Sequence, residues 1–467
     1  MGEVSIPKKY GILRIILRRP YRIAMASFLA AIAAGTLLLA LPWSSSTGRS
    51  VGVVDALFTS TSAVCVTGLV VRNTATDWSL FGQLVILALI QAGGVGIMTA
   101  YALLAVMVRQ RLSMGFERML TGVVPAGPAG GIWPTVKFIC ILTAVVEAAG
   151  AVCLFVSWRS DFDSFWRCAY FSVFHSISAF CNAGFSLFSD NLVRYRADGL
   201  VCLIICALIV VGGLGFLVAR DLKDFAEWWL LVRRGKRARL TTHTKLVLTV
   251  TFLLLFVGFV GIYLTESAAT LRDVPTSERM LAALFQSVTA RTAGYNTIDL
   301  SPGVVAPATA LLLMVLMFVG GSPGSTAGGV KTTTLGVMVT SIIATVRGSD
   351  RAEMFDHSVP QQVIHRVASI ILLALGVVVA GTFLLLVTER NTLGQFGFLS
   401  VMFETTSAFG TVGLSMGLTP HLSVWGRLII PAVMFVGRVG LITVLLSAAR
   451  VHRPVSYMYP PSDIMVG

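Results

Sequence analysis

Charged side chains are scarce in this chain. They make up 12% of its 467 residues, against roughly 25% in soluble globular proteins, whereas hydrophobic residues make up 55%. The mean hydropathy is +0.83. Apolar runs recur along the sequence, and each is long enough to cross a bilayer core of about 30 Å. The shortage of charge excludes an ordinary water-soluble domain and predicts a multi-pass membrane protein.

Residues that carry enzymatic chemistry are also few. The six histidines are scattered without an HExxH pattern, and the seven cysteines include no CxxC pair. Because the cysteines lie mainly in or beside apolar runs, they are expected to be buried small hydrophobes rather than disulfides or zinc ligands. We therefore predict that the chain is not an enzyme and binds no cofactor itself.

Acidic residues are outnumbered 22 to 36 by basic ones, which gives a net charge of +14. The basic residues gather in alternate loops, as the positive-inside rule requires, so this excess is not attributed to nucleic-acid binding. We expect an inner (plasma) membrane protein with both termini in the cytoplasm. The basic clusters lie before Ile23, at Arg109–Arg118, at Arg220–Lys245, around Arg347–Arg351 and at Arg450–Arg453.

The first apolar run, Ile23–Pro42, follows a basic segment as a secretory signal would. A signal peptide, however, has an apolar region of only about 7–15 residues. The run is therefore interpreted as a retained membrane helix.

One motif occurs four times at nearly even intervals. It reads Phe-x-[Ser/Thr]-x-[Ser/Thr]-Ala, then three or four residues, a glycine and a large apolar residue. Close helix packing through small residues would explain one copy, but not four copies in matching surroundings. The copies span Phe58–Leu69, Phe174–Phe185, Phe285–Tyr295 and Phe403–Leu414.

Each copy lies between two long apolar runs, on a weakly hydrophobic piece of about a dozen residues that would rise only about 18 Å as a helix. Such a piece is too short to span and is expected to be re-entrant. The fold class predicted is an all-α polytopic membrane protein with four fused units around a central pore, each a membrane helix, a half-helix with a loop, and a second membrane helix. The paired runs are Ile23–Pro42 and Leu80–Val108, Val136–Trp158 and Leu200–Val218, Leu246–Thr265 and Val304–Val346, and Val363–Thr388 and Val424–Ala448.

The resulting organisation has seven segments. The basic segment 220–245 is expected to be a solvated cytoplasmic anchor, with contact to a regulatory partner or anionic lipid as the alternative. The segments are a cytoplasmic N-terminus 1–22, pore units 23–110 and 111–219, the basic cytoplasmic loop 220–245, a third pore unit 246–350 with an intramembrane loop 320–333, a fourth pore unit 351–449, and a cytoplasmic tail 450–467.

Non-helical backbone at membrane depth is tolerated only where it is buried in protein or lines a water-filled cavity. Four half-helices that point their C-terminal ends at one axis favour a cation there. The motif hydroxyls can bond backbone groups and hold the loop, and the glycine permits conformations that turn carbonyls inward. Rings of such carbonyls replace the hydration shell of an ion. The sequence thus predicts a cation filter.

The stretches "TSAVCVTGL", "ISAFCNAGF", "VTARTAGYN" and "TSAFGTVGL" resemble the four filter loops of the Trk/Ktr/HKT superfamily of potassium transporters. The resemblance covers nearly the whole chain, and the short N-terminus is similar to that of KtrB-type membrane subunits. In plant relatives a serine in place of the first filter glycine goes with sodium transport, so Gly68 favours potassium. The resemblance implies ion-facing carbonyls at Val66, Thr67, Gly68, Asn182, Ala183, Gly184, Thr292, Ala293, Gly294, Thr411, Val412 and Gly413.

The resemblance also implies partners. KtrB-type proteins form homodimers on a cytoplasmic ring of KtrA-type regulatory subunits that bind ATP or ADP. Potassium is then the transported ion, sodium a candidate activator, and membrane lipids the surroundings, with no nucleic acid involved.

The outgoing run of the third unit, Val304–Val346, has 43 residues and would be about 65 Å long as one helix. Glycines and Pro323 interrupt it. Its "GGSPGSTAGGVKTT" is not a phosphate loop, because Val330 separates Gly329 from the lysine and no strand precedes it. A plain hinge stays open; the resemblance implies an intramembrane gate formed by Gly320, Gly321, Gly324, Gly328, Gly329 and Lys331.

Arg438 lies deep in the last apolar run, where a charge costs at least about 2.5–3.5 kcal/mol on insertion scales. A snorkelling side chain is the alternative to one that faces a cavity or a partner. The resemblance implies an arginine beside the gating loop. Its fork of donors is expected to bond the unpaired carbonyls of the broken helix.

Three functions are compatible with these observations. The first is a gated, channel-like potassium uptake subunit, and the second is a sodium-coupled potassium symporter. The third, the potassium-binding subunit of an ATP-driven pump, would be expected to carry additional spans at its ends.

Overall fold

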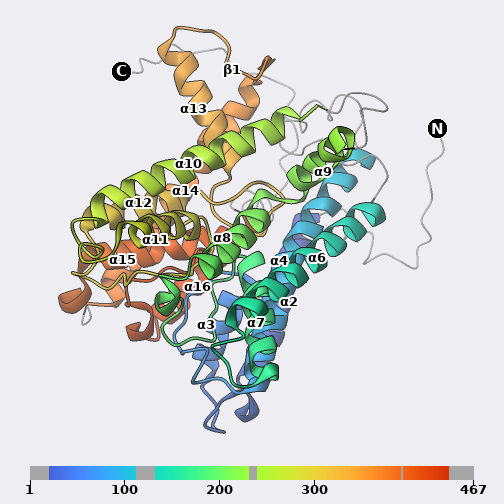
Figure 1. The fold of residues 1–467 in the computed structure, drawn as a ribbon. Coiled ribbons are helices and arrows are strands. Elements are labelled where there is room, and N and C mark those ends of the chain that lie inside the picture. Colours follow the sequence, from blue (N-terminus) through green and yellow to red (C-terminus); the bar gives the residue numbers. More distant parts are fainter. Residues whose placement is uncertain (1–19, 112–131, 231–238, 391–392, 441–467) are drawn as a thin grey trace.

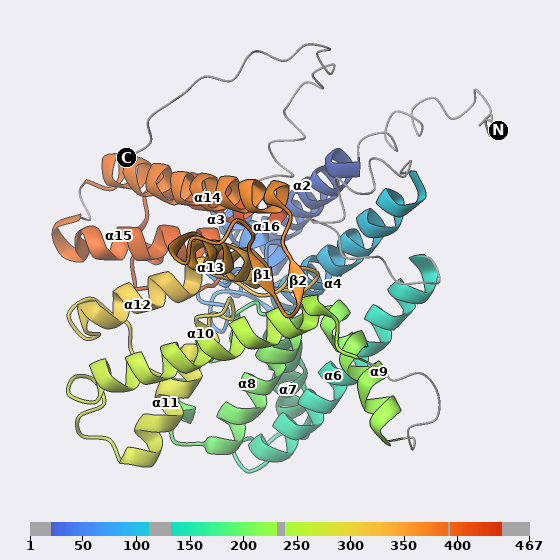
Figure 2. The same cartoon turned by 90° about the horizontal axis from the view of Figure 1, so that it is seen from above.

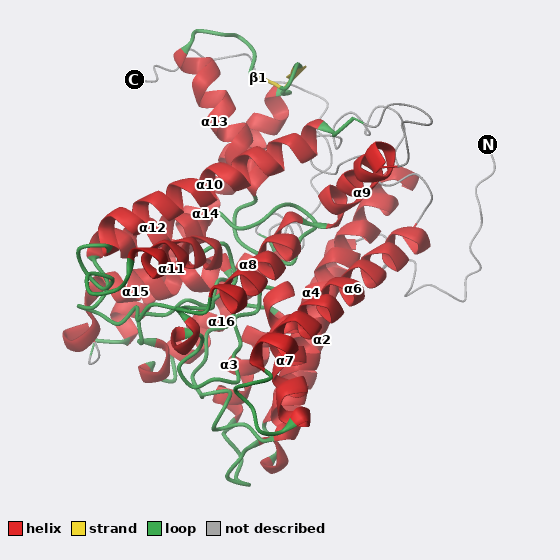
Figure 3. Ribbon diagram, viewed as in Figure 1, coloured by secondary structure: helices red, strands yellow, loops and turns green. Residues whose placement is uncertain are grey.

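The computed structural model describes residues 20–111, 132–230, 239–390 and 393–440. Helices dominate these residues, and the only strands among them form a short antiparallel hairpin (Figure 1, Figure 3), β1 (Glu353–Met354) with β2 (His357–Ser358). Outside the described residues lie most of the predicted N-terminus 1–22, residues 112–131 of the second pore unit, residues 231–238 of the predicted basic loop 220–245, residues 391–392 and 441–449 of the fourth pore unit, and the predicted tail 450–467.

Consecutive quarters of the chain occupy consecutive sectors around a common centre, as Figure 2 shows from blue to red. Contacts of α4 with α6, α8 with α11, α12 with α15, and α16 with α3 close the ring. The helices are α2 (Pro20–Leu39), α3 (Val53–Val64) and α4 (Leu80–Arg111); α6 (Ile132–Trp158), α7 (Phe165–Phe180), α8 (Gly199–Leu214) and α9 (Phe216–Leu230); α10 (Thr242–Glu266), α11 (Thr276–Thr289), α12 (Pro307–Phe318) and α13 (Thr332–Val346); and α14 (Gln361–Thr388), α15 (Leu393–Gly410) and α16 (Gly426–Val439). Short 3₁₀ turns lie at Pro42–Ser44, Val193–Tyr195 and Thr419–His421.

Among the described residues, three helices are individually long and apolar enough to cross a membrane, and they belong to α6, α10 and α14. A fourth candidate span is the bent pair α8–α9. Shorter apolar helices include α2, α3, α12 and α13. The incoming helices of units two to four are therefore straight spans, whereas the outgoing helices of units two and three are interrupted.

The outgoing run of the second unit differs from the continuous span expected at Leu200–Val218. It breaks at Gly215, and α8 and α9 meet at 101°. Gly215 has a φ of +83°, and a Cβ there would lie within 3.0 Å of the Ser322 hydroxyl. The close approach of the third unit thus requires glycine here. Residues 216–230, partly expected to be a basic loop, are helix α9 instead.

The interruption expected in the third unit is confirmed, since α12 ends at Phe318 and α13 begins at Thr332. The re-entrant piece of the fourth unit is longer than a dozen residues: α15 has 18, with a kink at Gly397, whose φ is +71°.

The half-helices dock on the incoming helices through the first hydroxyl of the motif. Ser60, Ser176 and Ser287 donate to backbone carbonyls of α2, α6 and α10 at 2.8, 2.6 and 2.8 Å. A glycine faces each hydroxyl so closely that a Cβ would lie within 3.0 Å of it; these are Gly35, Gly150 and Gly258. In the fourth unit Thr405 instead bonds Val401 of its own helix.

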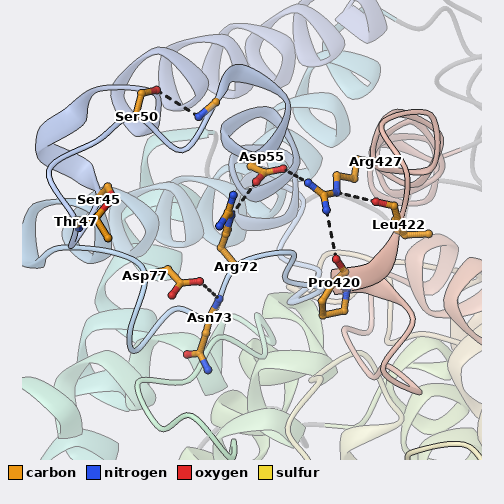
Figure 4. Close-up of polar contacts among 11 residues, drawn as sticks. Ser45, Thr47, Ser50, Asp55, Arg72, Asn73, Asp77, Pro420, Leu422 and Arg427 are labelled. Atoms are coloured by element: carbon orange, nitrogen blue, oxygen red, sulfur yellow. Dashed lines mark hydrogen bonds and ion pairs between the residues drawn. The ribbon is translucent and has the colours of Figure 1, made fainter.

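Asp55 joins the first and last units at one edge of the ring (Figure 4). This carboxylate, on α3, is 4% exposed. It accepts from Arg72 at 2.8 Å and from Arg427, on α16, at 2.6 Å. The ends of the chain are thereby closed into a ring by an ion pair as well as by apolar packing.

Candidate ion-conducting site

The same backbone conformation follows all four half-helices. Val66, Asn182, Thr292 and Thr411 have φ values of 54°, 59°, 73° and 50°, and the glycines two positions later have 88°, 68°, 77° and 93°. The residue between them does not have a positive φ. Positive φ is uncommon for such residues, so its recurrence at one position marks a shared constraint. Alternating the sign of φ turns successive carbonyls to one side, as a carbonyl-lined filter requires.

The four filter glycines form a closed ring in chain order. A Cβ on each would lie within 3.0 Å of the middle carbonyl of a neighbouring loop. No side chain larger than hydrogen fits without displacing that carbonyl. The pairs are Gly68 with Ala183, Gly184 with Ala293, Gly294 with Val412, and Gly413 with Thr67. The structure therefore brings the four predicted filter loops together in one ring through their glycines and middle residues.

The second hydroxyl of each motif holds its loop, as expected from the sequence. Ser62 accepts from the Gly68 amide at 3.1 Å and donates to the Leu69 carbonyl at 2.8 Å. In units two and three the hydroxyl again donates to the carbonyl of the residue after the filter glycine. In unit four the hydroxyl again accepts from the amide of the filter glycine. These bonds are Ser178–Phe185 at 2.9 Å, Thr289–Tyr295 at 2.5 Å and Ser407–Gly413 at 3.1 Å.

The outer ends of the second and third filter loops are joined to each other. The Tyr295 hydroxyl donates to the Phe185 carbonyl at 3.0 Å, and the Asn191 amide donates to the Gly294 carbonyl at 3.4 Å. Tyr295 is fully buried. The large residue after the filter glycine is thus a brace between units as well as a packing element.

The glycine-rich loop between α12 and α13 packs directly against the filter. A Cβ on Gly328 would lie within 3.0 Å of the Thr411 hydroxyl oxygen, and one on Gly320 would lie 3.3 Å from Thr292 Cγ2. The amide of Asn182 lies 3.2 Å from the Thr326 hydroxyl. The loop therefore touches the first filter residue of three units.

This loop also hydrogen-bonds the break in the second unit. Ser322 and Thr326 donate their amides to the carbonyls of Gly213 and Gly212 at 3.0 and 3.2 Å, and the Phe216 amide donates to Gly324 at 3.2 Å. The break between α8 and α9 and the break between α12 and α13 thus satisfy each other's backbone hydrogen-bonding groups, as burial away from water requires. Sequence reasoning missed the second break, although its signal was present in the run of glycines at Gly212–Gly215.

Arg438 is 2% exposed and bonds the loop, as expected from its depth. Its Nη1 donates to the Thr326 carbonyl, and its Nη2 donates to the Gly93 carbonyl of α4 at 3.1 Å. Lys331 donates to the Ala327 carbonyl of its own loop at 2.6 Å. The predicted gate glycines, Lys331 and Arg438 are therefore brought together beside the filter.

A second buried arginine was not singled out from the sequence. Arg291 is 7% exposed and donates Nη2 to the Gly320 carbonyl at 2.7 Å. Its signal was a charged residue inside an otherwise uncharged copy of the filter motif.

The TrkH family model, described as a cation transport protein, matches residues 9–457. The chain belongs to the TrkH family of cation transport proteins. As a TrkH-family protein with apolar spanning helices, it is a multi-pass membrane protein. The four-unit ring is accordingly the fold of a TrkH-type pore.

Individual relatives are similar over almost their whole length. The chain is 39% identical over 452 residues to the potassium/sodium uptake protein NtpJ of Enterococcus hirae, with 96% of this chain and 97% of that protein covered. It is 37% identical over 465 residues to the Ktr system potassium uptake protein B of Bacillus subtilis, with coverages of 98% and 99%. The crystal structure of the potassium transporter TrkH from Vibrio parahaemolyticus has a TM-score of 0.70 at 19% identity, covering 92% of this chain and 84% of that one, and shows the shared fold.

Proposed function

We propose that this chain is the potassium-selective, ion-translocating membrane subunit of a Ktr/Trk-type uptake system. The observation that carries the proposal is the closed ring of four glycines and four carbonyls. Carbonyl oxygens are neutral donors that replace water around a monovalent cation. The relatives from Enterococcus hirae and Bacillus subtilis are named as uptake proteins for potassium and sodium and for potassium, which supports the same ion class.

The second part of the proposal concerns the gate. The loop from Gly320 to Lys331 crosses beside the first filter residues, and the buried cation Arg438 bonds its backbone. A cation in a site of low dielectric repels a passing potassium ion by several kcal/mol in order of magnitude. Loop and arginine together form the closed barrier, which opens when both move.

The third part concerns topology and partners. The name of the Bacillus subtilis relative, protein B of a Ktr system, supports partnership with a regulatory subunit. In our proposal that subunit is cytoplasmic and binds ATP or ADP, and a homodimer of this chain sits on it. In this proposal the protein lies in the inner membrane, and both of its termini are on the cytoplasmic side. Single-cysteine labelling tests this: residues 159–167 and 271–279 are accessible from outside and Gly235 only from inside, and external labelling at Gly235 would overturn the four-unit topology.

A sodium-coupled symporter is the second candidate, favoured by the potassium/sodium name of one relative. Reversal potentials in proteoliposomes, with potassium and sodium varied separately, distinguish the two. We expect the potential to follow potassium and rubidium gradients alone. A potential that shifts with both ions in a fixed ratio would establish coupling, and one that follows sodium as readily as potassium would refute the filter assignment.

A further inference from the structure

One position distinguishes the third filter loop from the other three. Six residues after the motif phenylalanine, three units have an apolar residue and the third has Arg291. In the apolar units the backbone carbonyl at this position packs against a glycine of an outgoing helix, within 3.0 Å of where a Cβ would be. The pairs are Val64 with Gly93, Phe180 with Gly212 and Phe409 with Gly437. The outgoing helix of the third unit is broken at this level.

Arg291 occupies the junction between that break and the filter. Its Nη2 donates to the carbonyl of Gly320, the first glycine of the gating loop, at 2.7 Å. Its Nε and Nη1 are buried and have no hydrogen-bond partner among the described residues. The next residue is Thr292, the first residue of the third filter loop, held at a φ of +73°. One residue therefore joins the filter backbone to the gating loop.

Three cationic side chains cap carbonyls of the loop. Arg291 bonds Gly320, Arg438 bonds Thr326, and Lys331 bonds Ala327. A carbonyl that already accepts from a cation offers less to a passing potassium ion, and the cation repels that ion. Arg438 reaches the loop from α16, outside the filter segments, whereas Arg291 belongs to the turn that joins α11 to the third filter loop.

We propose that Arg291 is a positioning residue that holds the gating loop closed and couples it to the third filter loop. When the loop moves away from its closed position, the hydrogen bond from Arg291 to Gly320 transmits the displacement to the backbone at Thr292, in addition to the direct packing of Gly320 near Thr292. The inference rests on the proposed function, in which the loop is the gate. It predicts that Arg291 affects both flux and ion preference, whereas Arg438 affects flux alone.

The test compares Arg291→Met with wild type and with Arg438→Gln in the full-length protein reconstituted in liposomes. Methionine suits the site because the same position is apolar in the other three units. Without a regulatory partner, we expect the potassium flux of Arg291→Met per folded molecule to rise about tenfold, the effect of losing one charge-assisted hydrogen bond. Its potassium-over-sodium preference, read from reversal potentials, falls several-fold. Arg438→Gln raises flux without this change.

Arg291→Lys keeps the charge and one donor, so its flux is expected between those of wild type and Arg291→Met. A lysine variant that leaks as much as methionine would contradict the hydrogen-bonded holding of the loop. Wild-type flux and preference in Arg291→Met, beside a raised flux in Arg438→Gln, would refute this inference and leave the gate intact. Unchanged flux in both variants would refute the gate itself. Should methionine prevent folding, Arg291→Gln is judged by the same criteria.

Discussion

The filter and the gating loop lie side by side but are built by opposite rules. Each filter loop repeats one conformation, with positive φ at the first residue and at the glycine, and each is held by a hydroxyl of its own half-helix. The gating loop occurs once. Besides its bonds with Arg291 and Lys331 of its own unit, it bonds other units: Gly212 and Gly213 of the second, and Arg438 of the fourth.

The two kinds of bonding suit the two tasks that we propose, selecting the ion and closing the pore. A fourfold site must present equivalent carbonyls, so each unit has to supply its own support. A closure has to be released, so it depends on contacts between units that can shift relative to one another. Under the proposed function, local bonds therefore hold the filter loops, and bonds between units set the state of the pore.

The largest effect is expected from disturbing the ring. In Gly68→Ser the new Cβ meets the Ala183 carbonyl and the residue must keep a φ of +88°, which costs about 1–3 kcal/mol. We expect the potassium-over-sodium preference to fall about tenfold or more, measured as a shift in reversal potential. Gly48→Ser is the matched control, because Gly48 has a φ of +70° with nothing within 4 Å of a Cβ. Equal effects of both changes would locate the loss in backbone strain alone.

The next effect is on closure. Arg438→Gln removes the charge that bonds Thr326, and we expect flux to rise about tenfold with unchanged ion preference. Shortening the loop within 320–329 should raise flux similarly. Because both changes remove one obstacle, combining them should add little. Strictly additive activation free energies would show two separate barriers, and unchanged flux in a folded deletion would leave only a passive hinge.

A smaller effect is expected from the local supports. Ser178→Ala removes the hydroxyl that bonds the Phe185 carbonyl at 2.9 Å, a bond worth about 1 kcal/mol. Ion preference should therefore weaken by a few-fold. Thr405→Ala is the comparison, since its hydroxyl bonds only its own helix. A larger loss of preference in Thr405→Ala than in Ser178→Ala would contradict the assignment of support to the second motif hydroxyl.

The smallest effect on transport is expected at Asp55, which belongs to neither the filter loops nor the gating loop. Asp55→Asn weakens the ion pairs to Arg72 and Arg427 that join the first and last units. We expect the thermal unfolding temperature to fall by a few degrees with ion preference intact. A change of preference without loss of stability would place Asp55 in the conduction pathway instead.

The repeated parts of this molecule could be predicted from sequence. Four copies of a motif specify four half-helices, their hydroxyl supports and their glycines, because every requirement is met within about a dozen residues. Arg438 could be predicted to bond the broken helix, since a charge so deep in an apolar run needs a partner.

The parts that depend on contacts between segments distant in sequence could not be predicted. Gly215 needs a positive φ because Ser322 and Pro323 approach it from another unit. Nothing local distinguishes that glycine from one that packs helices. The role of Arg291 could not be predicted for a similar reason, because its hydrogen-bond partner, the Gly320 carbonyl, is 29 residues away in sequence. The sequence shows that the motif contains a charged residue, but only the fold determines which group that residue bonds.

The single loop beneath a fourfold ring has a consequence for how such a pore can arise. The loop touches Asn182, Thr292 and Thr411 at once, so four symmetric copies would compete for the same space against the filter. An assembly of four identical chains copies each mutation four times and cannot carry this closure. Fusion of the units into one polypeptide removes that constraint. It lets one quarter of the chain diverge into the proposed gate while the other three quarters do not have to carry a copy of it.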